Sequence, residues 1–191
     1  LVHHPRYLTE LERFCELGGG ELDPDTYASP GSWDTARRAA GAVLAAVDAL
    51  EAGGTDVAFA AGRPPGHPAV ADRAMGFCLY NNVAIGAMHA LDHHGLDRVA
   101  VIDFDVHHGN GTEDVFAGDE RVLMASIFQH PLYPYSGVDR PAPNMVNVPL
   151  PEGTGSEGFR EAVRERWLPA LDDHRPQLIF VSAGFDAHRE D

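Results

Sequence analysis

The sequence contains no lysine, only two cysteines and no long apolar run. Its 14 basic residues are all arginine and stand against 29 acidic residues, which gives a formal net charge of −15. So acidic a chain is a poor match for nucleic-acid phosphates, and we expect no direct nucleic-acid binding. Cys15 and Cys78 are too few for a disulfide framework or a Cys-x-x-Cys zinc motif. Because no apolar run reaches bilayer length, we expect no membrane partner and a cytoplasmic protein.

The length of 191 residues suits one domain with a buried core. The sequence begins at Leu1 without an initiator methionine and stops at Asp191, directly after a segment rich in polar residues. We therefore expect a fragment that lacks both termini, with residues 1–191 forming a single truncated catalytic domain. Nothing in the sequence predicts an oligomeric state.

Helical and strand patterns alternate along the chain. Apolar spacing predicts helices over 8–17, 33–52, 80–94 and 156–171, and short apolar runs predict strands over 57–61, 99–104, 122–128 and 178–183. This alternation is typical of a parallel sheet covered on both faces, which is an α/β fold of three layers. Ligands bind such sheets at the carboxyl ends of the strands. The polar residues that follow the predicted strands are His67, the segment 103–108, and Asp186.

A dense group of acids and histidines lies in VIDFDVHHGNG, residues 101–111. Asp103, Asp105 and His107 are two residues apart, so in an extended strand end they project from one face. Two carboxylates this close require a cation between them. Together with Asp186, the residues Asp105 and His107 make a three-ligand site with an open position, which is typical of a catalytic metal. Two oxygens and one nitrogen admit Zn²⁺, Fe²⁺ or Co²⁺. The alternative is a hydrogen-bonded acidic turn with surface histidines.

Several further residues are candidates for the same site. Pro64-Pro65-Gly66 rigidly orients His67, which is a candidate general base or else a surface histidine. Ser126 and the backbone of Ile127 end the next predicted strand, where they are placed to help hold a second cation near Asp103.

The remaining candidates have weaker patterns. Gly76 and Phe77 with Tyr133 are candidates for an apolar slot, although core packing explains them equally well. His108 either supports the metal residues or packs under the following loop. We expect His3, His4, His93 and His94 to be solvent-facing pairs.

Taken together, the motifs resemble the histone deacetylase superfamily, in particular its class II and bacterial acetylpolyamine amidohydrolase-like members. The resemblance covers essentially the whole chain, in order. Its motifs are RPPGHP (63–68), MGFCLYNNVAIGA (75–87), VIDFDVHHGNGTEDVF (101–116), YPYSG (133–137), VNVPLPEGTG (146–155) and SAGFDAHRED (182–191).

The resemblance implies an arginase/deacetylase-like three-layer α/β/α fold and a metal-dependent deacetylase that acts on an acylated lysine or an acylated amine. By motif position, the zinc ligands would be Asp105, His107 and Asp186, with Fe²⁺ as the alternative metal. Asp103 would orient the active-site histidine His67. The resemblance also implies a structural potassium ion and a narrow substrate tunnel. The potassium site would comprise Asp103, Asp105, His107, Ser126 and Ile127, and the tunnel would be flanked by Gly76, Phe77 and Tyr133.

Two departures from the family pattern leave alternatives open. Pro68 stands where the family has a second active-site histidine, usually the general base, and Asn110 loses its expected partner there. The family's transition-state tyrosine is expected beyond residue 191. One alternative is therefore a catalytically impaired deacetylase-like protein that binds acyl-amines. A ureohydrolase is the other, but His107-His108-Gly109 replaces the further aspartates that it would need.

Overall fold

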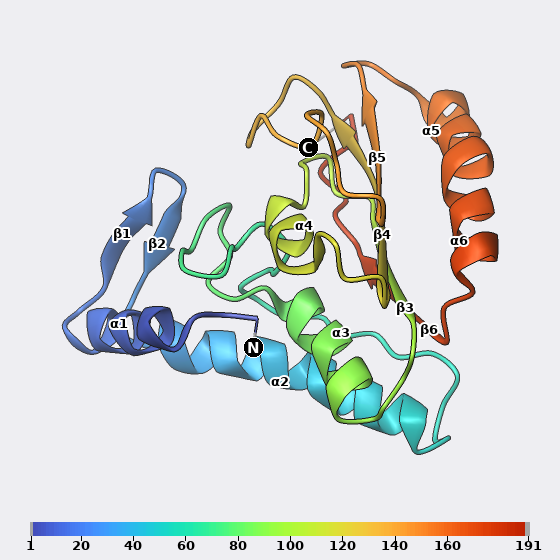
Figure 1. Cartoon of the computed structure of the whole chain (residues 1–191). Coiled ribbons are helices and arrows are strands. Elements are labelled where there is room, and N and C mark those ends of the chain that lie inside the picture. Colours follow the sequence, from blue (N-terminus) through green and yellow to red (C-terminus); the bar gives the residue numbers. More distant parts are fainter. Residues whose placement is uncertain (1, 190–191) are drawn as a thin grey trace. The chain divides into compact units, whose positions relative to one another are not determined.

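The chain divides into two compact units, Leu1–His94 and Gly95–Asp191. The structure is a computed structural model that describes residues 2–189, and each unit is best understood separately. The first is mainly helical and the second contains the main sheet (Figure 1). None of the helices formed by residues 2–189 is long and apolar enough to cross a membrane.

The first unit is built from three helices and a small hairpin. Its elements are α1 (Pro5–Glu16), β1 (Gly20–Asp23), β2 (Thr26–Ala28), α2 (Ser32–Glu51) and α3 (Asn82–Asp92). The helices predicted over 8–17, 33–52 and 80–94 are confirmed with shifts of a few residues at their ends. Leu11, Cys15, Ala36 and Ala40 form part of its core, and Cys78 is also buried. The alanines on α2 leave room for neighbouring chain segments to approach closely.

The strand predicted over 57–61 is wrong. These residues have no regular structure, and the side chains of Val57 and Phe59 are 80% and 82% exposed. A strand is stable only when its backbone groups pair with a neighbouring strand. The described part of the first unit offers residues 57–61 no such partner, so an apolar run alone does not make a strand there. The hairpin β1–β2, in contrast, forms outside the predicted strands.

The second unit is a four-stranded parallel sheet covered by helices on both faces. Its elements are β3 (Val99–Asp103), α4 (Asn110–Phe116), β4 (Val122–Gln129), β5 (Met145–Leu150), α5 (Ser156–Ala162), the π-helical turn η1 (Val163–Trp167), α6 (Leu168–His174) and β6 (Leu178–Ser182). The strand order is β5-β4-β3-β6. Figure 1 shows α4 on one face of this sheet and the α5–α6 helix on the other. The predicted three-layer α/β fold is therefore confirmed.

The strand β5 is the one element of this sheet that the sequence pattern did not predict. It contains Pro149, which cannot donate a ladder hydrogen bond, and it lies at the edge of the sheet. The core beneath β4 and β5 contains Ile127, Val148 and Trp167. Because β3 lies between β4 and β6, its carboxyl end is flanked on both sides by neighbouring strand ends.

Candidate metal centre and active-site loop

Asp103 is the last residue of β3 and is completely buried. Its register partners are Ser126 on β4 and Ser182 on β6. The strand thus ends one residue earlier than predicted, and residues 105–107 form bends. The explanation that Asp103, Asp105 and His107 alternate along an extended strand end is therefore wrong.

Aspartate side chains build these bends. The Oδ1 atom of Asp103 accepts a hydrogen bond from the Asp105 N–H at 3.1 Å, and Oδ1 of Asp105 accepts one from the His107 N–H at 2.8 Å. Such local bonds from an Asp side chain to the backbone two residues on favour turns over regular strand. The same carboxylates that are candidate ligands therefore also shape the loop that carries them.

The structure brings Asp105, His107 and Asp186 together. Nδ1 of His107 lies 3.0 Å from Oδ1 of Asp105 and 3.0 Å from Oδ2 of Asp186. The Val106 N–H donates to Oδ1 of Asp186 at 3.0 Å, which fixes this distant residue against the bend. One nitrogen or oxygen from each of the three residues lies within 4.8 Å of the others. Three converging donors from two loops form a candidate metal-binding set.

The three donor side chains are partly exposed, and the pKa of the histidine among them is raised. Their side chains are 15% (Asp105), 34% (His107) and 30% (Asp186) exposed, so a small molecule can reach them. Hydrogen bonds to Asp105 and then to Asp186 raise the pKa of His107 to about 9. The two carboxylates thus stabilise positive charge at this point, whether it is a proton or a metal ion.

Gly184 is required at the same place, although sequence reasoning did not single it out. A Cβ atom there would overlap the carboxylate and backbone of Asp105. The position follows β6 and precedes Asp186, so the backbone of one loop packs directly on the candidate ligand of the other. Its signal in the sequence was a glycine two residues before an acid at a strand end.

Ser126 presents a buried polar atom next to Asp103. Its Oγ is inaccessible to solvent and has no hydrogen-bond partner among residues 2–189. A buried hydroxyl without a partner is costly and calls for an explanation such as a bound ion. Because Ser126 is paired in register with Asp103, the oxygen lies where the second cation was expected.

His108 packs under the loop that follows β4, which was one of the two alternatives for it. It is buried, its Nδ1 is 2.8 Å from Oγ of Ser136, and its Nε2 is 2.9 Å from Oε2 of Glu113. Glu113 also accepts from Nδ2 of Asn147 at 2.7 Å, and its hydrogen bond to His108 holds the pKa of this carboxyl below its usual range. Sequence reasoning missed Glu113, Asn147 and Ser136.

Tyr133 lies beside the metal-binding set. Its ring centroid is 6.3 Å from that of His107, with the two planes at 74°. The residue is half-buried, so one part of the ring faces protein and another part faces solvent. This placement suits the wall of a binding slot next to the candidate metal ligands.

In the first unit, the N-terminus of α3 holds the loop that carries His67. Asn81 is buried and its Nδ2 donates to the carbonyls of His67 and Ala69 at 3.0 and 3.3 Å. Gly66 packs so closely on Asn82 that a Cβ atom would overlap the backbone there. His67 and Pro68 are both buried. The prolines of the loop are thus helped by one asparagine in fixing the position of His67.

Two other predictions in this unit have different outcomes. His3 is buried, not solvent-facing: its Nε2 accepts from the Asn81 N–H at 2.8 Å and its Nδ1 lies 3.0 Å from the Val70 carbonyl. Burial lowers the pKa of His3, which favours this neutral form. Phe77 is 60% exposed, with a positive φ like that of Gly76, so its side chain is available for contact rather than packed in the core.

Comparisons with known proteins agree with this fold. The family model described as the histone deacetylase domain matches residues 1–191. A histone deacetylase-like amidohydrolase from Pseudomonas aeruginosa is 43% identical and covers 100% of this chain and 52% of its own length. The crystal structure of the HDA15 HD domain has a TM-score of 0.91 and 34% identity, with coverage of 100% of this chain and 57% of that one.

An acetylpolyamine aminohydrolase from Burkholderia pseudomallei has a TM-score of 0.87 and 30% identity, with coverage of 100% of this chain and 66% of that one. These structures confirm the predicted deacetylase-like architecture. The chain spans 63%, 52% and 60% of the length of three of the curated relatives that it matches.

Proposed function

Because the chain belongs to the histone deacetylase domain family, we propose that the protein is a metal-dependent deacetylase. It hydrolyses the N-acyl bond of an acylated amine, either the side chain of an acylated lysine or a polyamine. The observation that carries this proposal is the convergence of Asp105, His107 and Asp186 at a partly open surface. Such an open, preformed set of donors is what a catalytic metal needs.

The donors fit zinc. Two carboxylates and one imidazole match the oxygen and nitrogen donors that Zn²⁺ accepts, and Fe²⁺ accepts the same set. When bound, a zinc ion supplies Lewis acidity, which polarises the acyl carbonyl and makes water a better nucleophile. The residues Asp105, His107 and Asp186 would hold it, and the Val106 N–H and Gly184 keep two of these side chains in position.

A potassium ion fits the second cation site. The buried Oγ of Ser126 and the buried carboxylate of Asp103 are neighbours across β3 and β4. Oxygen donors of this kind suit a hard monovalent cation, and such an ion would satisfy the serine hydroxyl. The proposed site also includes Asp105, His107 and Ile127, which are close in sequence to Asp103 or Ser126.

The other proposed roles belong to groups that handle the proton and the substrate. By motif position, His67 is assigned the transfer of a proton from the attacking water to the leaving amine, and Asp103 is assigned as its carboxylate partner. By the same motifs, Gly76, Phe77 and Tyr133 are assigned to contact the acylated arm. The exposed ring of Phe77 and the placement of Tyr133 beside His107 support this assignment.

The substrate class is supported by the similar proteins. One is named an acetylpolyamine aminohydrolase and another an amidohydrolase. Both names describe hydrolysis of an amide on an amine.

The test is hydrolysis of an acetyl-lysine peptide and of an acetylpolyamine by the zinc-loaded full-length protein. Asp186→Asn keeps the size of the side chain but removes its charge, so we expect turnover to fall to background. Asp114→Asn removes an exposed carboxylate of α4 and should leave turnover unchanged. A chelator should abolish turnover and added zinc should restore it.

Turnover that survives both Asp186→Asn and the chelator would overturn the metal-dependent assignment. Absence of turnover on both substrates, with zinc bound stoichiometrically, would overturn the assigned activity while leaving the metal site intact. The metal content of each variant distinguishes these two results.

A further inference from the structure

Three histidines gather at the carboxyl end of α3, in the sequence His89-Ala-Leu-Asp-His93-His94. His89 and His93 are four residues apart and so share one face of the helix. The N–H groups of His93 and His94 both donate to the His89 carbonyl, at 2.9 and 3.3 Å. Because both N–H groups share this acceptor, the chain turns tightly after the helix and brings His94 next to His89 and His93.

The three rings pack against one another in a compact group. His89 and His93 are stacked with centroids 4.7 Å apart and planes at 9°. The ring of His94 stands at 89° to both, at 5.0 and 4.9 Å. One ring nitrogen from each lies within 4.8 Å of the other two. The set is therefore a preformed group of three nitrogen donors.

A carboxylate from another helix completes the group. Oδ1 of Asp48, on α2, lies 2.7 Å from Nε2 of His89 and 2.8 Å from Nε2 of His94. Carboxylates bonded to histidine rings are the usual supports of metal-binding histidines, because they fix the tautomer and raise the basicity of the ring. Here one oxygen orients two of the three rings through their Nε2 atoms, so these rings would offer Nδ1 to an ion, and it adds a negative charge beside them.

We propose that His89, His93 and His94, supported by Asp48, form a second metal site that binds a divalent transition-metal ion of the zinc, nickel and copper group. Neutral imidazoles suit these metals, whereas calcium and magnesium require oxygen ligands. Three histidines with an open fourth position are an established zinc ligand set. The contacts with Asp48 account for the positions of His89 and His94, but not for that of His93, which converges with them.

This site is separate from the proposed catalytic centre in chain position. All four residues belong to the first unit, whereas Asp105, His107 and Asp186 belong to the second. An ion can reach it, because His93 is exposed and the side chains of His89 and His94 are 20% and 21% exposed. A bound ion would join α2 to the end of α3.

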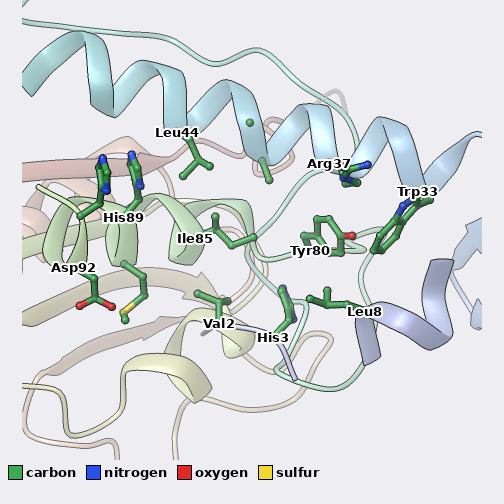
Figure 2. A pocket seen from close by; sticks show the side chains of 14 residues that line it. Val2, His3, Leu8, Trp33, Arg37, Leu44, Tyr80, Ile85, His89 and Asp92 are labelled. Atoms are coloured by element: carbon green, nitrogen blue, oxygen red, sulfur yellow. The ribbon is translucent and has the colours of Figure 1, made fainter. Parts of the chain in front are cut away.

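The site also opens on a pocket. His89 and His93 help to line a cavity of about 680 Å³ within the first unit. Figure 2 shows His89 and Asp92 at one end of it and Tyr80 and Trp33 at the other. The lining between them is mainly apolar. A fourth ligand could therefore be water or a small molecule that occupies the pocket.

The experiment measures bound zinc per chain in the full-length protein after equilibrium dialysis against buffered free zinc. His93→Gln is the main variant, because His93 is exposed and the contacts shown for its side chain are ring contacts alone. His4→Gln, which removes an exposed histidine outside the group, is the matched control. Both are also made in an Asp186→Asn background, which disables the proposed catalytic site.

We expect His93→Gln to bind about one zinc ion fewer than the wild type, and His4→Gln to bind the same amount as the wild type. The difference should persist in the Asp186→Asn background. Asp48→Asn should weaken binding at this site by about 10- to 100-fold, because it removes only the support of the rings.

Equal zinc content in wild type and His93→Gln, with both proteins folded by circular dichroism, would overturn the proposal. A second measurement distinguishes this site from nonspecific metal binding. With one equivalent of Cu²⁺ bound to the Asp186→Asn protein, the electron paramagnetic resonance spectrum should show coupling of the copper to several imidazole nitrogens. Loss of this signal in the double variant with His93→Gln supports the site, and its retention refutes it. Neither result depends on deacetylase activity.

Discussion

A proton on His107, held between Asp105 and Asp186, would make the proposed metal binding strongly dependent on pH. In the metal-free site, the two carboxylates raise the pKa of His107 to about 9, so the ring is protonated at pH 7. A histidine must lose its proton before it can bind a metal. Zinc therefore competes with one proton for the same site.

The size of the effect follows from the pKa. With a pKa of about 9, the apparent affinity for zinc should rise by about 50-fold between pH 7 and pH 9, and by less than about twofold from pH 9 to pH 10. With the ordinary histidine pKa of about 6.5, the rise between pH 7 and pH 9 would be only about 1.3-fold. The two cases differ enough to be separated by any direct binding measurement.

The stability of the metal-free protein should depend on pH in the opposite direction, and should fall as the pH rises. A histidine whose pKa is raised on folding stabilises the folded state fully below its unfolded pKa, near 6.5, and this contribution is lost as the pH rises through about 9. Alkaline conditions should therefore favour the zinc-bound protein and remove a stabilising proton from the zinc-free one.

The assay is competition with a chromophoric chelator of known, pH-corrected zinc affinity, carried out from pH 6.5 to pH 10 on the His93→Gln protein so that only the catalytic site responds. Nuclear magnetic resonance of the ¹⁵N-labelled imidazole rings should show one ring that titrates near pH 9 without metal. A ring of His107 that titrates near 6.5, with zinc affinity nearly constant above pH 7, would refute the reasoning.

Four further substitutions test the candidate metal centre and the loop that carries His67. Gly184→Ala should displace Asp105 and lower zinc affinity by about 10- to 100-fold, as measured by the same competition, and unchanged affinity would argue against the close packing. Ser126→Ala should remove the dependence of turnover on potassium, which a titration with KCl at constant ionic strength would detect. Asn81→Ala should lower the free energy of unfolding in urea by about 1–3 kcal/mol, because two carbonyls lose their donor. Pro68→His should raise turnover, by up to about 10²–10⁴-fold if the wild type lacks an effective general base; no gain on any acyl-amine would contradict a mechanism that uses His67 alone.

The sequence predicts well what depends on local pattern. The apolar runs at 99–104, 122–128 and 178–183 became the strands β3, β4 and β6, and the acids Asp105 and Asp186, which follow β3 and β6, came together. The edge strand β5 was not predicted, because it contains Pro149. Proline is unfavourable in most strands and tolerated at a sheet edge, and the sequence does not reveal which strand lies at the edge. The strand expected over 57–61 does not form, because an apolar run becomes a strand only when a neighbouring strand pairs with it.

The residues that were missed act through tertiary contact. Glu113 and Asn147 have no local signal, because each matters for a side chain brought to it by the fold. Gly184 had only the weak signal of a glycine two residues before an acid, and its role depends on the approach of Asp105. His3 was misjudged for the same reason: its partners are at positions 70 and 81. Histidine pairs near the end of a helix were expected to face solvent, yet His94 bonds to a carboxylate on another helix.

The late arrival of Asp186 in the chain has a consequence for biosynthesis. The hydrogen bond that fixes it joins residues 80 positions apart, and β6 pairs with β3 only after β4 and β5 have been made. Strands β3, β4 and β5 can pair as they leave the ribosome, but Asp186, the last residue of the proposed metal-binding set, emerges afterwards. Until then Asp105 and His107 form only part of the set. If these residues hold a metal ion as proposed, a nascent chain should acquire it only near the end of the synthesis of this region.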